Sequence, residues 1–189
     1  REEKLIGHTE TVNGQDFTID EEAAEAIMLY VETCREYMTK AKEFIVEQRL
    51  DMTHIATDMF GTADFVAYSE DESTVTVCDL KFGRGVAVEA DDPQLLIYAM
   101  GAAKLFHNRG LRKIEMVVVQ PRCYHPDGPV RRYKIDPADL LDHEADIIDA
   151  AKRSDKDQAY LNHGSWSKFR KASANCPAMA KVVDESSKI

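Results

Sequence analysis

Apolar residues recur at helical spacing in three segments of the chain, and polar residues suited to a helix start precede each segment. Thr18 or Asp20 can cap the first segment, which continues with an acidic first turn. Asp92 and Pro93 open the second segment, with proline at the first helical position. The pattern predicts helices over 19–40, 91–110 and 136–154.

Shorter apolar segments between these helices either alternate with polar residues or run continuously, as strands do. The polar residues 70–73 separate two of these segments and indicate a hairpin turn. The run 112–122 is strongly apolar and β-branched, which is typical of a central strand. The predicted strands are 43–50, 61–69, 74–81, 112–122 and 130–135. Because helices and strands interleave, the sequence predicts an α/β fold with a central mixed sheet flanked by helices.

Length and composition narrow the class of protein. The 189 residues are 44% hydrophobic and 31% charged, which suits a single domain over 1–189 with a substantial core. No apolar run is long enough to span a membrane, so we expect no membrane partner. Four widely spaced cysteines suit a reducing cytoplasm without a disulfide framework. Residues 1–10 resemble no signal peptide and contain no initiator Met, so we expect the chain to begin inside a longer protein.

Charge weakens a nucleic-acid interpretation without excluding it. The formal net charge of −10 disfavours general binding to phosphates, which requires Lys and Arg. The acidic residues are unevenly distributed, however, and the segments 110–113, 129–134 and 168–171 are locally basic. Because local patches decide binding, a basic groove on an acidic protein stays possible.

Two carboxylates in apolar strands are the first candidates for chemistry. Asp64 lies in the second predicted strand and Asp79 near the end of the third, and one register of the hairpin places them side by side. Carboxylates there, with the backbone carbonyl of Leu80, suit Mg²⁺ or Mn²⁺. Lys81 shares a strand face with Asp79, where an ammonium can orient a water molecule or stabilise charge on a phosphate. An exposed Asp–Lys pair without function is the alternative, but charges within apolar strands are costly unless they are paired or bind metal.

The next predicted helix adds two polar side chains. Gln94 and Tyr98 are four residues apart, so they share one face of this helix. A tyrosine on such a helix usually belongs to the core, whereas a glutamine on the same stripe is less expected there. Together the two groups could bind a phosphate or orient Lys81.

These residues resemble the core of the PD-(D/E)XK nuclease superfamily, in its RecB-like branch of phage and prophage exonucleases related to CRISPR-associated RecB-type nucleases. The branch carries G-x-x-D, then D-x-K, then Q-x-x-x-Y. The matching residues here are Gly61 and Asp64, Asp79 and Lys81, and Gln94 and Tyr98. The resemblance covers residues 20 to 122 well, and three ordered motifs are far more specific than any one of them.

The resemblance implies a restriction-endonuclease-like core and metal-dependent hydrolysis of DNA. By position, Asp64 and Asp79 would be metal ligands, Lys81 the catalytic lysine, and Gln94 and Tyr98 supports on the substrate side. Glu47 matches a glutamate of the branch, either in the outer shell of the metal or as a buried partner of Arg49 or Lys81. The resemblance also implies exonuclease action in phage DNA recombination, repair or processing within the bacterial cytoplasm, beside an annealing protein or helicase.

The chain departs from the branch at two places. The upstream helical histidine of the branch has no match, because His8 and His54 lack its setting. Many relatives also hold an Fe–S cluster, and 164–180 resembles the C-terminal cysteine pattern that ligates it. Ser167 and Arg170 stand where cysteines would be, leaving only Cys176, so we expect no Fe–S cluster and a degenerate segment over 155–189.

Several readings of the function stay open. The first is a Mg²⁺- or Mn²⁺-dependent deoxyribonuclease, including a CRISPR-adaptation nuclease that trims DNA ends as a less favoured variant. The second is a catalytically inactive DNA-binding or scaffold domain that retains the fold, and the third is a purely structural α/β domain. For DNA contacts the locally basic sequence suggests Arg84, Arg122, and the cluster of Arg131, Arg132 and Lys134.

Overall fold

The computed structural model describes residues 6–157, 159, 161, 164 and 175–178. Contacts divide the chain into two compact units, residues 1–148 and 149–189, and the sheet belongs to the first. The expectation of one domain over the whole chain stays a prediction. Ser167 and Arg170, on which the expectation about an Fe–S cluster depends, lie outside the described residues.

In the described part of the chain, a five-stranded sheet and three α-helices make up the α/β fold, which confirms the predicted class. The strands of the main sheet are β3 (Glu43–Asp51), β4 (Phe60–Ser69), β5 (Thr74–Leu80), β6 (Lys113–Val119) and β7 (Val130–Ile135). The helices are α1 (Glu21–Met38), α2 (Pro93–Leu105) and α3 (Pro137–Ser154), with a short 3₁₀ helix η2 (His107–Arg109) after α2. The strand order is β3-β4-β5-β6-β7, and only the β5–β6 pair is parallel, so the sheet is mixed.

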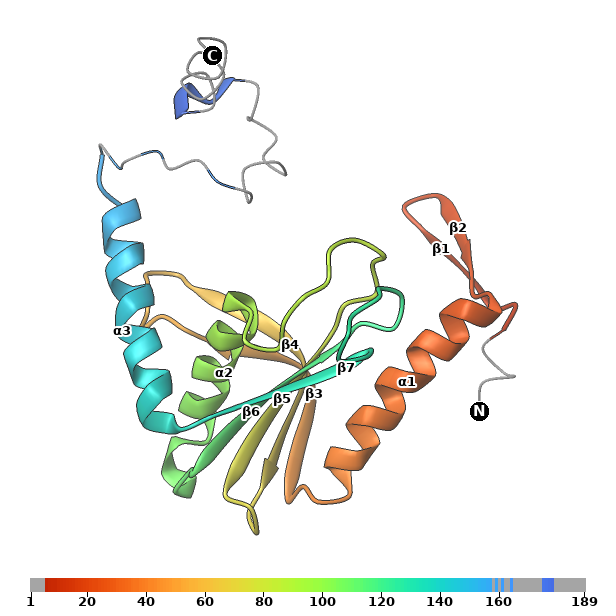
Figure 1. Ribbon diagram of the computed structural model, residues 1–189, viewed down its shortest axis with the longest axis horizontal. Coiled ribbons are helices and arrows are strands. Elements are labelled where there is room, and N and C mark those ends of the chain that lie inside the picture. Colours follow the sequence, from red (N-terminus) through yellow and green to blue (C-terminus); the bar gives the residue numbers. More distant parts are fainter. Residues whose placement is uncertain (1–5, 158, 160, 162–163, 165–174, 179–189) are drawn as a thin grey trace. The chain divides into compact units, whose positions relative to one another are not determined.

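The two faces of the sheet are covered by different helices (Figure 1). On one face, Cys34 of α1 packs with Phe65, Cys78 and Val117 of the strands. On the other face, α2 is the connection between the parallel strands β5 and β6, and its buried side chains pack against the sheet. Leu140 of α3 joins that second core. The carboxyl end of β5 and the start of α2 therefore lie on the same side of the molecule.

A small hairpin before α1 is absent from the predicted elements. It consists of β1 (Thr9–Val12) and β2 (Gln15–Thr18), which pair antiparallel around Asn13 and Gly14. Both turn residues have positive φ, 54° and 79°, as a two-residue hairpin turn requires. The Asn-Gly pair was the sequence signal for this turn.

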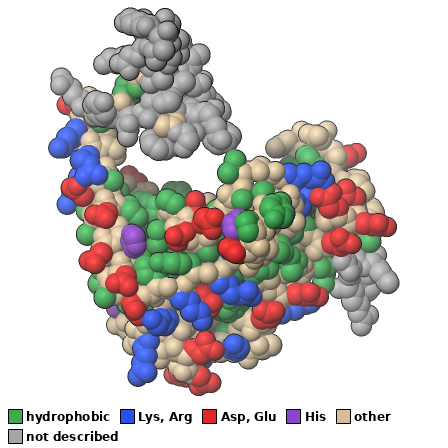
Figure 2. Space-filling model, viewed as in Figure 1, with side chains coloured by type: hydrophobic (Ala, Val, Ile, Leu, Met, Phe, Trp, Pro, Cys, Tyr) green, Lys and Arg blue, Asp and Glu red, His purple; other side chains and the backbone are tan. Residues whose placement is uncertain are grey.

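No helix in the described part of the chain is both long enough and apolar enough to cross a membrane. On the face drawn in Figure 2, Lys and Arg side chains lie among Asp and Glu side chains and form no continuous basic band. Any nucleic-acid interface on this face would therefore be local.

Candidate functional site

Asp64 and Asp79 occupy facing positions on β4 and β5. The last ladder pair of these strands is Phe65 with Cys78, so the next position in the same register sets Asp64 opposite Asp79. The ladder stops there because the Asp64 side chain takes over the pairing: the Leu80 backbone N–H donates a hydrogen bond to its Oδ2 at 2.8 Å. The hairpin register that the sequence left open is therefore the one that brings the two carboxylates together.

An irregularity in β4 accompanies the Asp64 contact. Ala63 and Val66 belong to the core cluster beside α2, although residues three apart on a regular strand lie on opposite faces. Glu47, opposite Asp64 on β3, has a positive φ of 51° and interrupts the β3–β4 ladder. The regular alternation of side chains between the two faces of the sheet is therefore interrupted at Glu47 and Asp64. At this irregular position, the Asp64 side chain reaches the backbone of β5.

Glu47 itself is a surface residue of β3. It is exposed, so it is not a buried partner of Arg49 or Lys81, and that alternative is wrong. Arg49 stacks on the ring of Phe60 instead, with Cζ 3.5 Å from the ring centroid. A role for Glu47 in the outer shell of a metal stays a prediction.

Asp79 is a buried carboxylate that forms an ion pair with Lys81. The residue is 4% exposed, and Nζ of Lys81 lies 2.8 Å from its Oδ2. Burial raises the pKa of Asp79, and the lysine only partly opposes this shift. Among the described residues, the Lys81 ammonium is the group that lies at Oδ2, and no further donor reaches this oxygen. A buried oxygen with unused acceptor capacity is suited to a cation.

A chain of hydrogen bonds links Lys81 to α2. Nζ of Lys81 donates to Oε1 of Gln94 at 2.6 Å, and Nε2 of Gln94 donates to the hydroxyl of Tyr98 at 2.9 Å. Asp92 caps α2 by accepting from the backbone N–H of Gln94 at 2.8 Å, which fixes the first turn. Residues of the D-x-K and Q-x-x-x-Y motifs thus form one network beside Asp64 and Asp79.

Gly61 makes room for Tyr98. A Cβ atom at position 61 would lie 2.5 Å from Cε1 of Tyr98, closer than real contacts allow. The glycine of the G-x-x-D motif therefore has a steric reason: only a residue without a side chain lets the tyrosine ring rest on β4.

Substitution of Gly61 by alanine should displace Tyr98 and destabilise the protein by about 1–3 kcal/mol, as overpacking does. The measurement is the free energy of unfolding from urea denaturation. Gly83→Ala is the matched control, because a Cβ there meets no atom within 4 Å. Equal stabilities of the two variants would contradict the tight contact at Gly61.

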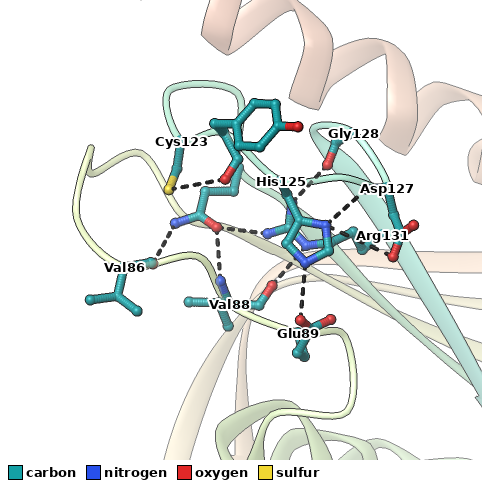
Figure 3. A network of polar contacts seen from close by, with 10 residues as sticks. Val86, Val88, Glu89, Cys123, His125, Asp127, Gly128 and Arg131 are labelled. Atoms are coloured by element: carbon teal, nitrogen blue, oxygen red, sulfur yellow. Dashed lines mark hydrogen bonds and ion pairs between the residues drawn. The ribbon is translucent and has the colours of Figure 1, made fainter.

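A second polar network fixes the loops that flank the site (Figure 3). Oε1 of buried Gln120 accepts from the Val88 N–H at 3.0 Å and from a terminal nitrogen of Arg131 at 2.7 Å. Nε of Arg131 donates to the Val88 carbonyl at 2.7 Å, and its other terminal nitrogen donates to the Gly128 carbonyl at 2.9 Å. Nε2 of His125 also lies within hydrogen-bond distance of a Glu89 carboxylate oxygen, at 3.0 Å. The loop between β5 and α2 is thereby held against the loop between β6 and β7.

This network corrects the prediction that Arg131 contacts DNA. Arg131 is 5% exposed, and all three of its nitrogens donate to protein acceptors. Alternation along β7 sends Arg131 toward the α2 face and Arg132 toward α1, where Arg132 contacts Tyr37 at 3.0 Å and Glu36 at 3.3 Å. The basic cluster of the sequence is therefore split between the two faces, and Arg132 lies on the face opposite Lys81 and Gln94.

Replacing Arg131 with methionine should lower the free energy of unfolding by about 2–4 kcal/mol, because buried carbonyls of Val88 and Gly128 lose their donor. Arg132→Met removes a more exposed guanidinium and should cost less than about 1 kcal/mol. Urea denaturation of both variants measures the difference. If Arg131→Met lowers the free energy of unfolding less than Arg132→Met does, Arg131 is not the buried residue that holds the two loops together.

Arg84 and Arg122 lie at the carboxyl ends of β5 and β6 and converge on Glu22 of α1. Arg84 pairs with Oε2 of Glu22, and Nε of Arg122 donates to Oε1 at 3.0 Å. The guanidinium of Arg122 also lies over the ring of Phe82, 4.5 Å from its centroid. Sequence reasoning missed Glu22 and Phe82, which the tertiary fold brings to Arg122, and it missed Gln120, which the fold brings to Arg131.

The described residues contain no group of three or more His, Cys, Asp or Glu side chains arranged to hold a metal. The protein part of a cation site would consist of the Asp64 and Asp79 carboxylates. Leu80, the predicted carbonyl ligand, lies between Asp79 and Lys81 and is partly exposed. Two carboxylates suffice for Mg²⁺, which keeps several waters and binds substrate phosphates as well.

Comparison with known proteins shows a family and a distant likeness. The solved structure "Crystal structure of SSO0001" is 19% identical, with 83% of this chain and 71% of that chain covered and a TM-score of 0.44. That likeness is too distant to carry an argument about activity. The sequence model of the family described as "Protein of unknown function (DUF2800)" matches residues 2–188. Because this match spans nearly the whole sequence, the chain belongs to the DUF2800 family.

Proposed function

We propose that the protein is a metal-dependent deoxyribonuclease of the RecB-like PD-(D/E)XK type, and that it acts as an exonuclease. The observation that carries the proposal is the network of Asp79, Lys81, Gln94 and Tyr98 beside Asp64. These residues follow one another along the chain in the order of the three nuclease motifs. In the fold, hydrogen bonds join Lys81 of the second motif to Gln94 and Tyr98 of the third. A structural domain has no need for a buried, incompletely satisfied carboxylate at that point.

The donor set fits a divalent cation. Asp64 and Asp79 offer hard oxygen atoms on neighbouring strands, and Oδ2 of Asp79 has unused acceptor capacity among the described residues. Bound Mg²⁺ or Mn²⁺ would supply Lewis-acid stabilisation of the phosphodiester. The Leu80 N–H holds the Asp64 carboxylate toward β5, so this ligand is oriented before any cation arrives.

Lys81 would act directly on the substrate. Its ammonium lies at the rim of the site, with 23% of the side chain exposed, where it can reach a phosphate or the attacking water. Gln94 accepts a hydrogen bond from this ammonium and Tyr98 fixes Gln94, so both are positioning residues. The protein would thereby hold a positive charge ready where negative charge develops on the phosphate.

Arg84 and Arg122 are the DNA contacts that remain on this side of the fold, next to the strand ends that carry Asp79 and Lys81. Contacts of this kind orient the nucleic-acid backbone and carry no sequence information. The resemblance to the RecB-like branch also supports a role in phage DNA recombination, repair or processing in a bacterial cytoplasm, beside an annealing protein or helicase.

Incubation of the protein with end-labelled linear DNA and with closed circular DNA of the same sequence tests the proposal. We expect degradation of the linear DNA with Mg²⁺ or Mn²⁺, none in EDTA, and intact circles. Cleavage of the circles would replace the exonuclease with an endonuclease. DNA that is bound but intact with either metal would favour the catalytically inactive DNA-binding domain.

A further inference from the structure

Glu22 is an acidic side chain placed between two arginines of the loops that follow β5 and β6. Its carboxylate oxygens are divided between them: Oε2 pairs with Arg84, and Oε1 accepts from Nε of Arg122 at 3.0 Å. The three residues come from α1 and from two loops, separated by 62 and 100 positions along the chain. A carboxylate held by two guanidinium groups has the charge and shape of the contact that arginines make with a phosphate.

Both arginines lie in the loops that leave the neighbouring ends of β5 and β6. The Lys81 backbone N–H donates to the Val119 carbonyl at 2.9 Å, which aligns the ends of β5 and β6. Arg84 follows Lys81 by three residues, and Arg122 follows Val119 by three. The Glu22 carboxylate is thus held by the two loops that leave the site, beyond the lysine.

Arg122 is already ordered in the free protein. Its guanidinium stacks on Phe82 at 4.5 Å, and only 21% of its side chain is exposed. The buried Gln120 network holds the backbone of the same loop. An arginine with fixed geometry loses little conformational freedom on binding a phosphate, which favours a preformed subsite.

We propose that Arg84 and Arg122 form a subsite for a backbone phosphate of the nucleic-acid substrate, and that Glu22 occupies this subsite as an internal competitor until the substrate displaces it. The inference rests on the proposed function, because it assigns part of the substrate path of that site. Displacement is feasible because the Glu22 side chain is about half exposed and can turn into solvent. The contact would lower affinity for DNA, because a backbone phosphate has to displace Glu22 before it can bind the two arginines.

The test is DNA affinity without divalent metal, measured by fluorescence anisotropy on a labelled oligonucleotide in EDTA at low salt. Glu22→Gln should bind about 3- to 10-fold more tightly than wild type, since two exposed ion pairs no longer compete. Glu25→Gln is the matched control: it removes the same charge one turn further along α1, from an exposed residue, and should change affinity less than about twofold. Arg122→Gln should weaken binding and reduce the slope of log affinity against log salt by about one.

The double variant Glu22→Gln/Arg122→Gln decides between competition and a general charge effect. If Glu22 competes for the arginine subsite, most of the gain from Glu22→Gln disappears in the Arg122→Gln background. An equal gain in both backgrounds, an equal gain from Glu25→Gln, or no DNA binding by any variant would overturn the inference. So would weaker binding by Glu22→Gln together with a lower melting temperature, because Glu22 would then serve only to hold the loops.

Failure of this inference and failure of the proposed function give different results. If the protein cleaves DNA with metal but Glu22→Gln leaves DNA affinity unchanged, the role of Glu22 as a competitor is rejected and the nuclease proposal stands. If Glu22→Gln binds DNA more tightly but the protein cleaves no DNA with any metal, the phosphate subsite stands and the nuclease proposal is rejected.

Discussion

Replacing Lys81 with alanine is expected to lower the single-turnover rate of metal-dependent DNA cleavage at least about 100-fold, the usual loss when one preorganised charge stabiliser is removed. Lys81 is the cation that Gln94 and Tyr98 hold at the rim of the site, and its position depends on both of them. DNA affinity should fall only slightly, since Arg84 and Arg122 are proposed to contact the DNA backbone as well. The rate is measured with enzyme in excess over end-labelled linear DNA.

Lys113→Ala is the control for the loss of a lysine. Lys113 is exposed at the opposite end of the parallel strand pair, where it contacts Asp136 at 2.7 Å, so its removal should leave the rate unchanged. If Lys81→Ala cleaves DNA as fast as the wild type, the lysine takes no part in the chemistry. Loss of DNA binding in the same proportion as the rate would assign Lys81 to binding alone.

Asp79→Asn is expected to abolish cleavage and, in EDTA, to raise the melting temperature. Burial of the Asp79 carboxylate outweighs the attraction of Lys81 and raises its pKa, so the charged form opposes folding at neutral pH. The neutral amide of asparagine has the same shape, and its burial carries no such cost for a charge. Mn²⁺ should stabilise the wild type and leave the variant unchanged, because a ligand that binds only the folded state raises stability with its concentration.

The pH dependence of this effect has a definite sign. A carboxyl whose folded-state pKa is raised binds more protons in the folded than in the unfolded protein, so its contribution to stability is lost as pH rises from the ordinary value of 3.8 through the raised value. In EDTA, the melting temperature of Asp79→Asn relative to wild type should therefore increase from pH 4 upward and then level off. Asp71→Asn, in the exposed turn between β4 and β5, is the control for the loss of a surface carboxylate. A variant less stable than wild type at pH 7 would contradict the uncompensated burial of Asp79.

Local sequence patterns predicted the parts of the site that depend on local geometry. The spacing of four placed Gln94 and Tyr98 on one face of α2, and their hydrogen bond confirms that placement. Alternation along β5 predicted that Asp79 and Lys81 share a face, and their nitrogen and oxygen atoms lie 2.8 Å apart. The polar turn at 70–73 predicted the hairpin that carries both aspartates.

Local sequence patterns could not predict the features that depend on contacts between distant parts of the chain. A run of basic residues suggested one patch at Arg131 and Arg132, but pairing of β7 with β6 buries the first and directs the second to the other face. The contacts of Glu22 join residues up to 100 positions apart, and no local pattern indicates them. The β1–β2 hairpin is different, since Asn13 and Gly14 were a local signal for it.

The most direct test of the central claim is one time course of linear end-labelled DNA with Mn²⁺, comparing wild type with Asp79→Asn. The predicted result is progressive release of labelled product by the wild type, none in EDTA, and none by the variant although it is folded and binds DNA. If the wild type binds the DNA and leaves it intact, or if Asp79→Asn cleaves as fast as the wild type, the carboxylate and lysine site is not the centre of a nuclease.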